Sequence, residues 1–169
     1  METALILPIP EADPAVAPWR ERYDPSASEG VPAHVTVLVP FMPINEIDEA
    51  CVETLSGIFG GHRAFELSFA RLERFPETLW LAPEPDAPIQ RLAEAIVAQF
   101  PDYPPYGGEF DNVIPHLTIA QGDGEALDRI AEEIIETIAL PIRARIHECV
   151  LYEHVPGQWQ ERHRFSLRS

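Results

Sequence analysis

Residues 34–41 read His-Val-Thr-Val-Leu-Val-Pro-Phe, and residues 116–121 read His-Leu-Thr-Ile-Ala-Gln. Both stretches begin with the pattern His-x-Thr followed by an aliphatic residue, and both are rich in residues that favour strands. Because side chains alternate across a strand, the histidine and the threonine should share one face, while the aliphatic residues anchor the other face in a core. Each stretch therefore predicts a strand that presents one imidazole and one hydroxyl to the same space.

The elements that follow the two motifs occur in the same order. A strand, a helix and a hairpin are predicted at 34–41, 45–59 and 65–81, and again at 116–121, 125–139 and 142–167. The two histidines are 116 − 34 = 82 residues apart, and the helix starts are 125 − 45 = 80 residues apart. Two copies of one unit should pack about a pseudo-two-fold axis, so that the two motifs meet across it. We expect one duplicated α+β domain over residues 1–169, with repeat units at about 34–81 and 116–167.

The segments outside these repeat units are predicted from local signals. Residues 4–9 read as a strand, and Asp13 reads as the N-cap of a helix with proline at its first position. Residues 24–32 and 101–113 are rich in proline, glycine and polar residues and read as surface loops. A further amphipathic helix is expected to begin near Asp86.

The composition restricts the class of partner. The chain has 169 residues, a formal net charge of −16, and 12 basic residues that are all arginine. Such an acidic protein gains little from counterion release, so any nucleic-acid substrate should be small or touched only at one end, such as a small nucleotide or an RNA 3′-end, and no extended duplex nucleic acid is expected. No apolar run is long enough to cross a bilayer, and the N-terminus lacks a basic signal-peptide region, which predicts a cytoplasmic protein with no membrane partner. Cys51 and Cys149 are too few for a disulfide framework, and we expect a monomer.

The residue types in the two motifs suit phosphodiester cleavage. If His34 and His116 flank one phosphate, the neutral imidazole can take a proton from water and the protonated one can give a proton to the leaving oxygen. The hydroxyls of Thr36 and Thr118 can donate to the non-bridging oxygens, where charge grows in the transition state. The competing interpretation is that both histidines are buried partners of backbone groups and both threonines are ordinary strand residues. The remaining histidines show no spacing typical of metal ligands, so no metal site is predicted.

Aromatic and basic residues near the motifs are candidates for contacts to a nucleotide. The aromatic candidates for stacking on a base are Phe41, Tyr106, Trp80, Tyr103 and Tyr152. Phe41 directly follows the first motif strand, and Tyr106 lies in the loop before the second, so these two are the preferred choices. Core packing is the competing interpretation for each ring. Arg74 and Arg164 could balance the charge of a phosphate, although arginine side chains at strand positions are commonly solvated.

The pair of His-x-Thr motifs resembles the 2H phosphoesterase superfamily, and in particular its 2′-5′ RNA ligase and 2′,3′-cyclic phosphodiesterase-like family. Residues 106–118 read Tyr-Gly-Gly-Glu-Phe-Asp-Asn-Val-Ile-Pro-His-Leu-Thr and are similar to family members with the same Phe-Asp and Pro-His-Leu-Thr approach. The segment Val39-Pro40-Phe41 after the first motif also fits. The resemblance covers nearly the whole chain and implies a bilobal fold, with two antiparallel sheets lining a central cleft and the helices outside.

The resemblance also implies a reaction. His34 and His116 match the catalytic pair and Thr36 and Thr118 match phosphate-binding residues, with neither a metal nor another cofactor implied. The family acts on 2′,3′-cyclic nucleotides, RNA ends, 2′-5′ linkages and ADP-ribose cyclic phosphate. We therefore expect a metal-independent hydrolase of 2′,3′-cyclic phosphates, with 2′-5′ RNA ligation as the reverse reaction, although the acidic, lysine-free chain departs from members that grip long RNA. The alternative is a module of the same fold that binds a nucleotide or phosphate without turnover. His116 is the preferred choice for the base, but the sequence leaves open which histidine is the base and whether the product is a 2′- or a 3′-phosphate.

Overall fold

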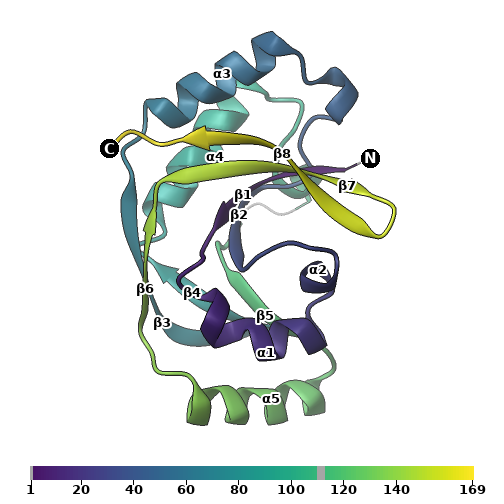
Figure 1. Ribbon diagram of the computed structural model, residues 1–169, viewed down its shortest axis with the longest axis vertical. Helices are drawn as coiled ribbons and strands as arrows, with labels where there is room; N and C mark the ends of the chain where they lie inside the picture. The colour runs from purple at the N-terminus through teal and green to yellow at the C-terminus, as the bar shows by residue number, and fades with distance from the viewer. Residues whose placement is uncertain (1, 110–112) are drawn as a thin grey trace.

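Two antiparallel sheets and the helices packed on them make up the computed structural model (Figure 1), which describes residues 2–109 and 113–169. Of the segment quoted above, Phe110, Asp111 and Asn112 lie outside the described residues. In chain order the elements are β1 (Thr3–Pro8), α1 (Asp13–Tyr23), α2 (Pro25–Ser28), β2 (His34–Leu38), η1 (Ile44–Glu46), α3 (Glu49–Gly60), β3 (Phe65–Phe75), β4 (Thr78–Glu84), α4 (Ala87–Gln99), η2 (Pro105–Gly108), β5 (Leu117–Gln121), α5 (Gly124–Thr137), β6 (Ile142–Ile146), β7 (Glu148–Val155) and β8 (Gln158–Ser166). Among the described residues, none of the helices combines the length and the apolar character needed to span a membrane.

The strands form two four-stranded sheets. The first sheet has the order β2-β1-β7-β8 and the second has the order β5-β4-β3-β6, with all neighbouring strands antiparallel. Helices α3 and α4 lie together over the first sheet, α3 against β8 and α4 against β2, whereas α1 and α5 lie against β5 of the second sheet (Figure 1). The predicted bilobal α+β architecture with two antiparallel sheets is therefore confirmed.

Each half of the chain completes the sheet of the other half. The order strand, helix, strand, helix, strand occurs first as β1-α1-β2-α3-β3 and then as β4-α4-β5-α5 followed by β6 and β7. In the second sheet β3 lies between β4 and β6, and in the first sheet β7 lies between β1 and β8. The helices are exchanged too, since α1 contacts β5 and α4 contacts β2. The repeated order thus starts at β1 and β4, earlier in each half than the motif strands.

In the hairpin predicted at 142–167, residues 142–155 were expected to form one continuous strand. The structure divides them into two strands. His147 separates β6, which pairs with β3 at the edge of the second sheet, from β7 in the centre of the first sheet. In β6, buried residues alternate with the exposed Arg143 and Arg145, whereas β7 is buried over most of its length. The prediction was wrong because an edge strand and a central strand follow each other in one apolar run, and local periodicity does not separate them.

The start of the first helix also differs from its prediction. Asp13 is the first residue of α1 rather than its N-cap, and its carboxylate accepts a hydrogen bond from the Ala33 N–H at 2.9 Å. The predicted loop 24–32 contains the short helix α2, whose N-cap Asp24 accepts a hydrogen bond from the Ser26 N–H at 3.1 Å. Both aspartates are used in contacts that tie α1 to the chain before β2.

Helices α3 and α5 each begin with an aspartate cap. Asp48 accepts a hydrogen bond from the Cys51 N–H at 2.8 Å, so α3 begins later than the predicted residue 45. Asp123 accepts a hydrogen bond from the Ala126 N–H at 2.8 Å at the start of α5. Such a side chain satisfies an N–H that has no partner inside the helix, which fixes where the helix starts.

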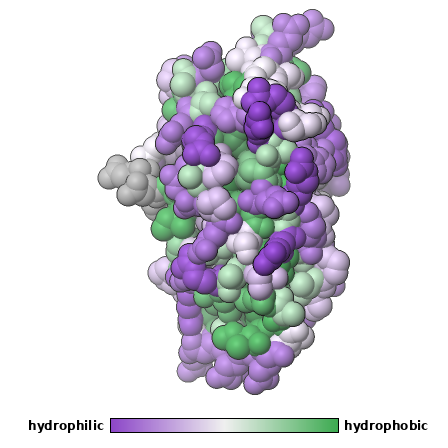
Figure 2. Space-filling view, turned by 90° about the vertical axis from the view of Figure 1, so that its left-hand side faces the viewer, coloured by the Kyte–Doolittle hydropathy of each residue, from purple (hydrophilic) through white to green (hydrophobic). Residues whose placement is uncertain are grey.

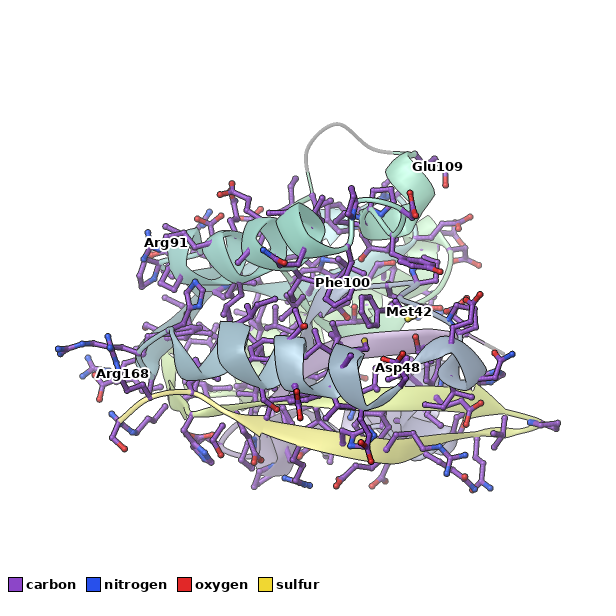
Figure 3. The ribbon with its side chains drawn as sticks, turned by 90° about the horizontal axis from the view of Figure 1, so that it is seen from above. Met42, Asp48, Arg91, Phe100, Glu109 and Arg168 are labelled. Atoms are coloured by element: carbon purple, nitrogen blue, oxygen red, sulfur yellow. The ribbon has the colours of Figure 1, made fainter. Side chains whose placement is uncertain are left out.

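Helices α3 and α4 cover one face of the first sheet. Seen from above in Figure 3, α3 and α4 run side by side over this sheet, and Met42 and Phe100, near them, pack against the main core. Leu5 and Leu7 of β1 also belong to the main core. A separate buried cluster consists of Ala4, Ile6, Val31, Val150 and Tyr152. Because Ala4 and Ile6 alternate with the two leucines along β1, this cluster lies on the opposite face of the sheet.

The surface reflects the acidic composition. Figure 2 shows one side of the molecule, on which polar residues predominate and hydrophobic residues show between them. The large hydrophobic side chains that are exposed among the described residues are Ile114 and Ile135. With a formal net charge of −16, this surface favours solubility over contact with a polyanion.

Candidate functional site

The structure brings the two His-x-Thr motifs together. Strands β2 and β5 lie at the edges of their sheets, and the two strands approach each other to within 8 Å between Cα atoms. His34, Thr36, His116 and Thr118 are all half-buried, and the aliphatic residues between and after them are buried. The two strands therefore have the same pattern of exposure, as a pseudo-two-fold relation between them requires.

Both imidazoles make the same hydrogen bond. His34 Nδ1 lies 2.8 Å from the carbonyl oxygen of Pro32, and His116 Nδ1 lies 2.7 Å from the carbonyl oxygen of Ile114. A carbonyl oxygen only accepts, so Nδ1 must carry the hydrogen in each ring. In the neutral form of each histidine, Nε2 then holds the lone pair. This geometry leaves two equivalent nitrogens, one per motif, that can accept or donate a proton.

The protein environment favours the neutral form of both rings. Burial lowers the pKa of His34 below its ordinary value of 6.5, and the charges of Arg20 and His116 lower it further, while the bond to Pro32 and the charge of Asp24 raise it. Burial also lowers the pKa of His116, and the bond to the Ile114 carbonyl raises the pKa in part. The charge of His116 is the smallest of the effects on His34, as expected for two rings on facing strands.

The threonine hydroxyls lie beside the rings on the same strands. Thr36 is paired with Ile6 of β1, and Thr118 is paired with Trp80 of β4. Within the part of the chain that the structure describes, neither hydroxyl makes a hydrogen bond to another residue. The hydroxyls are therefore open to a ligand that lies between the two strands.

Two aromatic rings lie beside the imidazole of His116. The His116 ring lies 5.2 Å from Phe75 at 84° and 5.8 Å from Trp80 at 65°, both edge-to-face. The indole Nε1 of Trp80 is buried and has no hydrogen-bond partner among the described residues. The sequence offered Trp80 as a base-stacking candidate but gave no signal for Phe75, because this contact exists only once β3, β4 and β5 pair.

Phe41 lies in the core rather than at a rim. Its side chain is 3% exposed, and its ring packs edge-to-face against Phe100 at 5.3 Å and Tyr103 at 5.8 Å. These contacts favour the competing interpretation, in which Phe41 stabilises the fold. A base that stacked on this ring would first have to displace two aromatic neighbours.

Tyr106 stays close to the first motif strand. Its N–H donates to the Val39 carbonyl just after β2 at 2.6 Å, and its φ of 51° is in the left-handed region that tyrosine rarely adopts. Its side chain is half-buried, and burial raises the pKa of the phenol. Base stacking by Tyr106 stays a prediction.

The arginine candidates are paired with carboxylates. Arg74 is bound to Asp128 and to the Gly124 carbonyl, and Arg164 is bound to Glu148 and Glu161. These bonds occupy the guanidinium groups with partners of the protein itself, so neither arginine is directed to the motifs. Within residues 2–109 and 113–169, no group of three histidine, cysteine or carboxylate side chains is placed to hold a metal ion.

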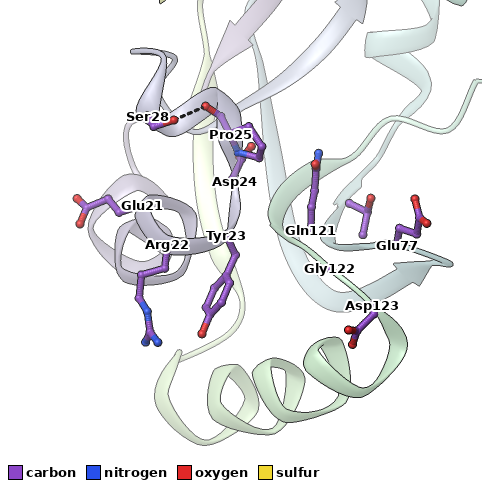
Figure 4. Close-up of a pocket in the computed structure, with 11 residues that line it drawn as sticks. Glu21, Arg22, Tyr23, Asp24, Pro25, Ser28, Glu77, Gln121, Gly122 and Asp123 are labelled. Carbon is purple, nitrogen blue, oxygen red and sulfur yellow. Dashed lines mark hydrogen bonds between the residues drawn. The ribbon is translucent and has the colours of Figure 1, made fainter. Parts of the chain in front are cut away.

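A polar cavity of about 810 Å³ lies at the far end of β5 (Figure 4). It is lined by Glu21, Arg22, Tyr23, Asp24, Pro25, Ser28, Glu77, Thr78, Gln121, Gly122 and Asp123. None of these residues belongs to a His-x-Thr motif, and Asp24 and Asp123 are engaged as helix caps. We therefore place the candidate site at the two motifs, where proton-transferring groups meet, and not at this cavity.

Solved structures with the same fold share little sequence with this chain. The structure of E. coli LigT complexed with 3′-AMP is 19% identical, with a TM-score of 0.65 over 99% of this chain and 98% of that chain. A structure described as a phosphoesterase is also 19% identical, with a TM-score of 0.64 over the same shares of the two chains. The protein TT0787 of Thermus thermophilus is 17% identical, with a TM-score of 0.63 over 100% of this chain and 99% of that chain. At such identities the likeness establishes the fold.

The family is established by the sequence itself. No curated protein matches the chain. The profile described as the 2′-5′ RNA ligase superfamily matches residues 8–158, which include both motifs and most of both sheets. This match agrees with the LigT-like fold and with the resemblance seen in the two motifs. The chain thus belongs to the 2′-5′ RNA ligase superfamily of 2H phosphoesterases.

Proposed function

We propose that this protein is a metal-independent phosphodiesterase that hydrolyses the 2′,3′-cyclic phosphates of nucleotides or short RNA ends. His34 and His116 act as the general acid and base, and Thr36 and Thr118 bind the non-bridging phosphate oxygens. The observation that carries this proposal is the matching geometry of the two rings. Each donates Nδ1–H to the carbonyl two residues before it, and each leaves Nε2 for the substrate.

The proposed reaction needs one proton taken and one proton given. The neutral histidine takes a proton from water through Nε2 while the water oxygen forms a bond to phosphorus. The bond from phosphorus to one ribose oxygen breaks, and the protonated histidine gives its proton to that oxygen. The threonine hydroxyls donate to the non-bridging oxygens as their charge grows. The product is a nucleoside monophosphate, and proton exchange with water restores the two rings.

Two further observations support a small nucleotide substrate. E. coli LigT, which has the same fold, is described in complexes with 3′-AMP, phosphate, NADP+ and ATP. The net charge of −16 opposes the approach of a long polyanion, so a mononucleotide or a short RNA end fits this surface better than an extended RNA. Tyr106 of η2, whose N–H bonds to the Val39 carbonyl just after β2, is the ring that we propose for stacking on the base.

The proposal is tested by product formation from the four 2′,3′-cyclic nucleotides in excess EDTA. We expect turnover in the wild-type protein and a loss of about 10²–10⁴-fold in kcat for His34→Ala and for His116→Ala. The matched control is His163→Ala, because His163 is exposed on β8, at the opposite edge of the first sheet from β2. Full activity of either motif variant would eliminate the proposal.

The second candidate function is a binding module. The unpartnered hydroxyls of Thr36 and Thr118 could hold a phosphate without any proton transfer, as far as the described residues show. Calorimetry of nucleotide binding, combined with product analysis after long incubation, separates the two candidates. Affinity without product would favour the module, and product that depends on both histidines would exclude it.

A further inference from the structure

A buried ion pair lies on α1 next to the chain that leads into β2. Arg20 is 3% exposed and Asp24 is 5% exposed, and Arg20 Nε lies 3.0 Å from Asp24 Oδ2. Other polar atoms of the pair are also bonded. Arg20 Nη2 donates to Ser26 Oγ at 3.2 Å and to the Val31 carbonyl at 3.0 Å, and Asp24 Oδ1 accepts from Ser26 N and Oγ. Two charges so deeply buried are tolerated only when they are paired in this way, so the network must persist in the folded protein.

Two side chains of α1 hold the backbone on either side of Pro32. Arg20 binds the carbonyl of Val31, just before Pro32, at 3.0 Å. Asp13 Oδ1 accepts from the N–H of Ala33, just after Pro32, at 2.9 Å. Arg20 and Asp13 also lie near each other, with Nη1 and Oδ1 3.8 Å apart. The peptide groups around Pro32 are thus fixed by one helix.

The Pro32 carbonyl is the group that orients the first catalytic ring. It accepts the Nδ1–H of His34 at 2.8 Å, and the neighbouring Val31 and Ala33 are buried. The corresponding carbonyl in the second half belongs to Ile114, which is 51% exposed. The two rings therefore make the same bond to carbonyls in different surroundings.

We propose that Arg20 and Asp13 are positioning residues, which hold the Pro32 carbonyl so that His34 keeps Nδ1–H and presents Nε2 to the substrate. This inference rests on the proposed function and adds two residues from outside the motifs. The positioning role depends on the α1 contacts, since the bonds made by the two rings are otherwise alike.

Arg20 also acts on His34 through its charge. The ionisable groups that act on it are Arg20 and Asp24 from the α1–α2 region and His116 from the other half of the chain. Arg20 and His116 lower the pKa of His34, and the effect of Arg20 exceeds the opposite effect of Asp24. Removing the Arg20 charge should thus raise the pKa of His34 even if Asp24 becomes protonated.

The first test is an NMR titration of the free protein, which does not depend on activity. The His34 signals are identified by their loss in His34→Ala. In Arg20→Met we expect a raised pKa for His34, whereas Arg22→Met, which removes an exposed arginine from the same helix, should leave it unchanged. An unchanged pKa together with an unchanged Nδ1–H tautomer of His34 in a folded Arg20→Met variant overturns the proposal.

The second test uses a matched pair at Asp13, which is at less risk of unfolding because its side chain is 37% exposed. Asp13→Asn keeps the Oδ1 acceptor for the Ala33 N–H, and Asp13→Ala removes it. We expect kcat to fall by about tenfold to hundredfold in Asp13→Ala with little change in KM, and Asp13→Asn to stay near wild type. The ¹⁵N shifts of His34 should show a mixture of tautomers in Asp13→Ala alone. Equal activity and equal tautomers in the two variants would refute a positioning role.

The third test uses the pH profile of kcat/KM. In Arg20→Met one limb of the profile should move to higher pH, because the limb that reports His34 follows its raised pKa. A profile in which neither limb moves would overturn the link between Arg20 and His34. A protein with no activity on any cyclic phosphate would refute the proposed function, while the titration and the tautomer shifts would still decide whether α1 positions His34.

Discussion

Replacing Phe41 with leucine separates core packing from base stacking. Phe41 follows the first motif strand, yet its ring is buried against Phe100 and Tyr103. If the ring stabilises the fold, Phe41→Leu should lower the free energy of unfolding and leave KM for a cyclic nucleotide unchanged. If the ring stacks on a base, the substitution should raise KM instead.

The size of the effect follows from the two ring contacts. Leucine keeps much of the buried aliphatic volume but loses the edge-to-face contacts at 5.3 and 5.8 Å. Each aromatic pair contributes about 0.5–1.5 kcal/mol beyond area burial, so we expect a loss of about 1–3 kcal/mol. At roughly 2–4 °C per kcal/mol for a chain of this length, Tm should fall by about 2–12 °C.

Urea denaturation and steady-state kinetics, both on the same preparation, measure the two quantities. Tyr106→Leu is the matched variant, because it also replaces an aromatic residue beside β2 by leucine. Stacking of an aromatic ring on a base contributes about 1–3 kcal/mol. If Tyr106 stacks in this way, the KM of the Tyr106→Leu variant should rise by about fivefold or more. A Phe41→Leu protein with wild-type stability and a raised KM would refute the reasoning.

Three further outcomes follow from the structure. Burial lowers the pKa of both His34 and His116 below 6.5. The pH range in which the base is deprotonated while the acid is still protonated therefore lies at low pH, so kcat/KM measured against pH should peak below 6.5. A peak above 6.5 would contradict the burial of the pair. Arg164→Ala should leave KM for a cyclic nucleotide unchanged, since Arg164 binds Glu148 and Glu161. A clear rise in KM would instead indicate that Arg164 contacts the substrate. Asp48→Ala should cost about 1 kcal/mol in urea denaturation through loss of the α3 cap, without a change in kcat; unchanged stability would show that the cap is dispensable.

Local patterns predicted the parts of the fold that depend on local contacts. The alternation after His34 and after His116 predicted the two motif strands, and the hairpin predicted at 65–81 corresponds to β3 and β4. The amphipathic spacing gave α4 and α5 within a few residues. The meeting of the two motifs was inferred from the repeat, and the contact between β2 and β5 agrees with it.

The features that were missed depend on distant parts of the chain. Residues 142–155 divide between two sheets because β3 and β1 offer separate edges, which no pattern inside the segment reveals. Phe41 is buried because α4 and the residues after it supply two rings. Asp13 leaves the cap position because the Ala33 N–H needs an acceptor. Each of these outcomes is decided by a partner far away in sequence, where propensity carries no information.

The exchange of strands between the halves has a consequence for how the molecule comes apart. Since β3 sits inside the sheet of the second half and β7 inside that of the first, neither half retains an intact sheet when the other melts. If one lobe unfolds, strands of both lobes lose hydrogen-bonded neighbours, so the two lobes should unfold in a single cooperative event. The same interlocking ties the spacing between the two histidines to the integrity of the whole molecule, so that damage in either lobe should remove turnover and secondary structure in the same transition.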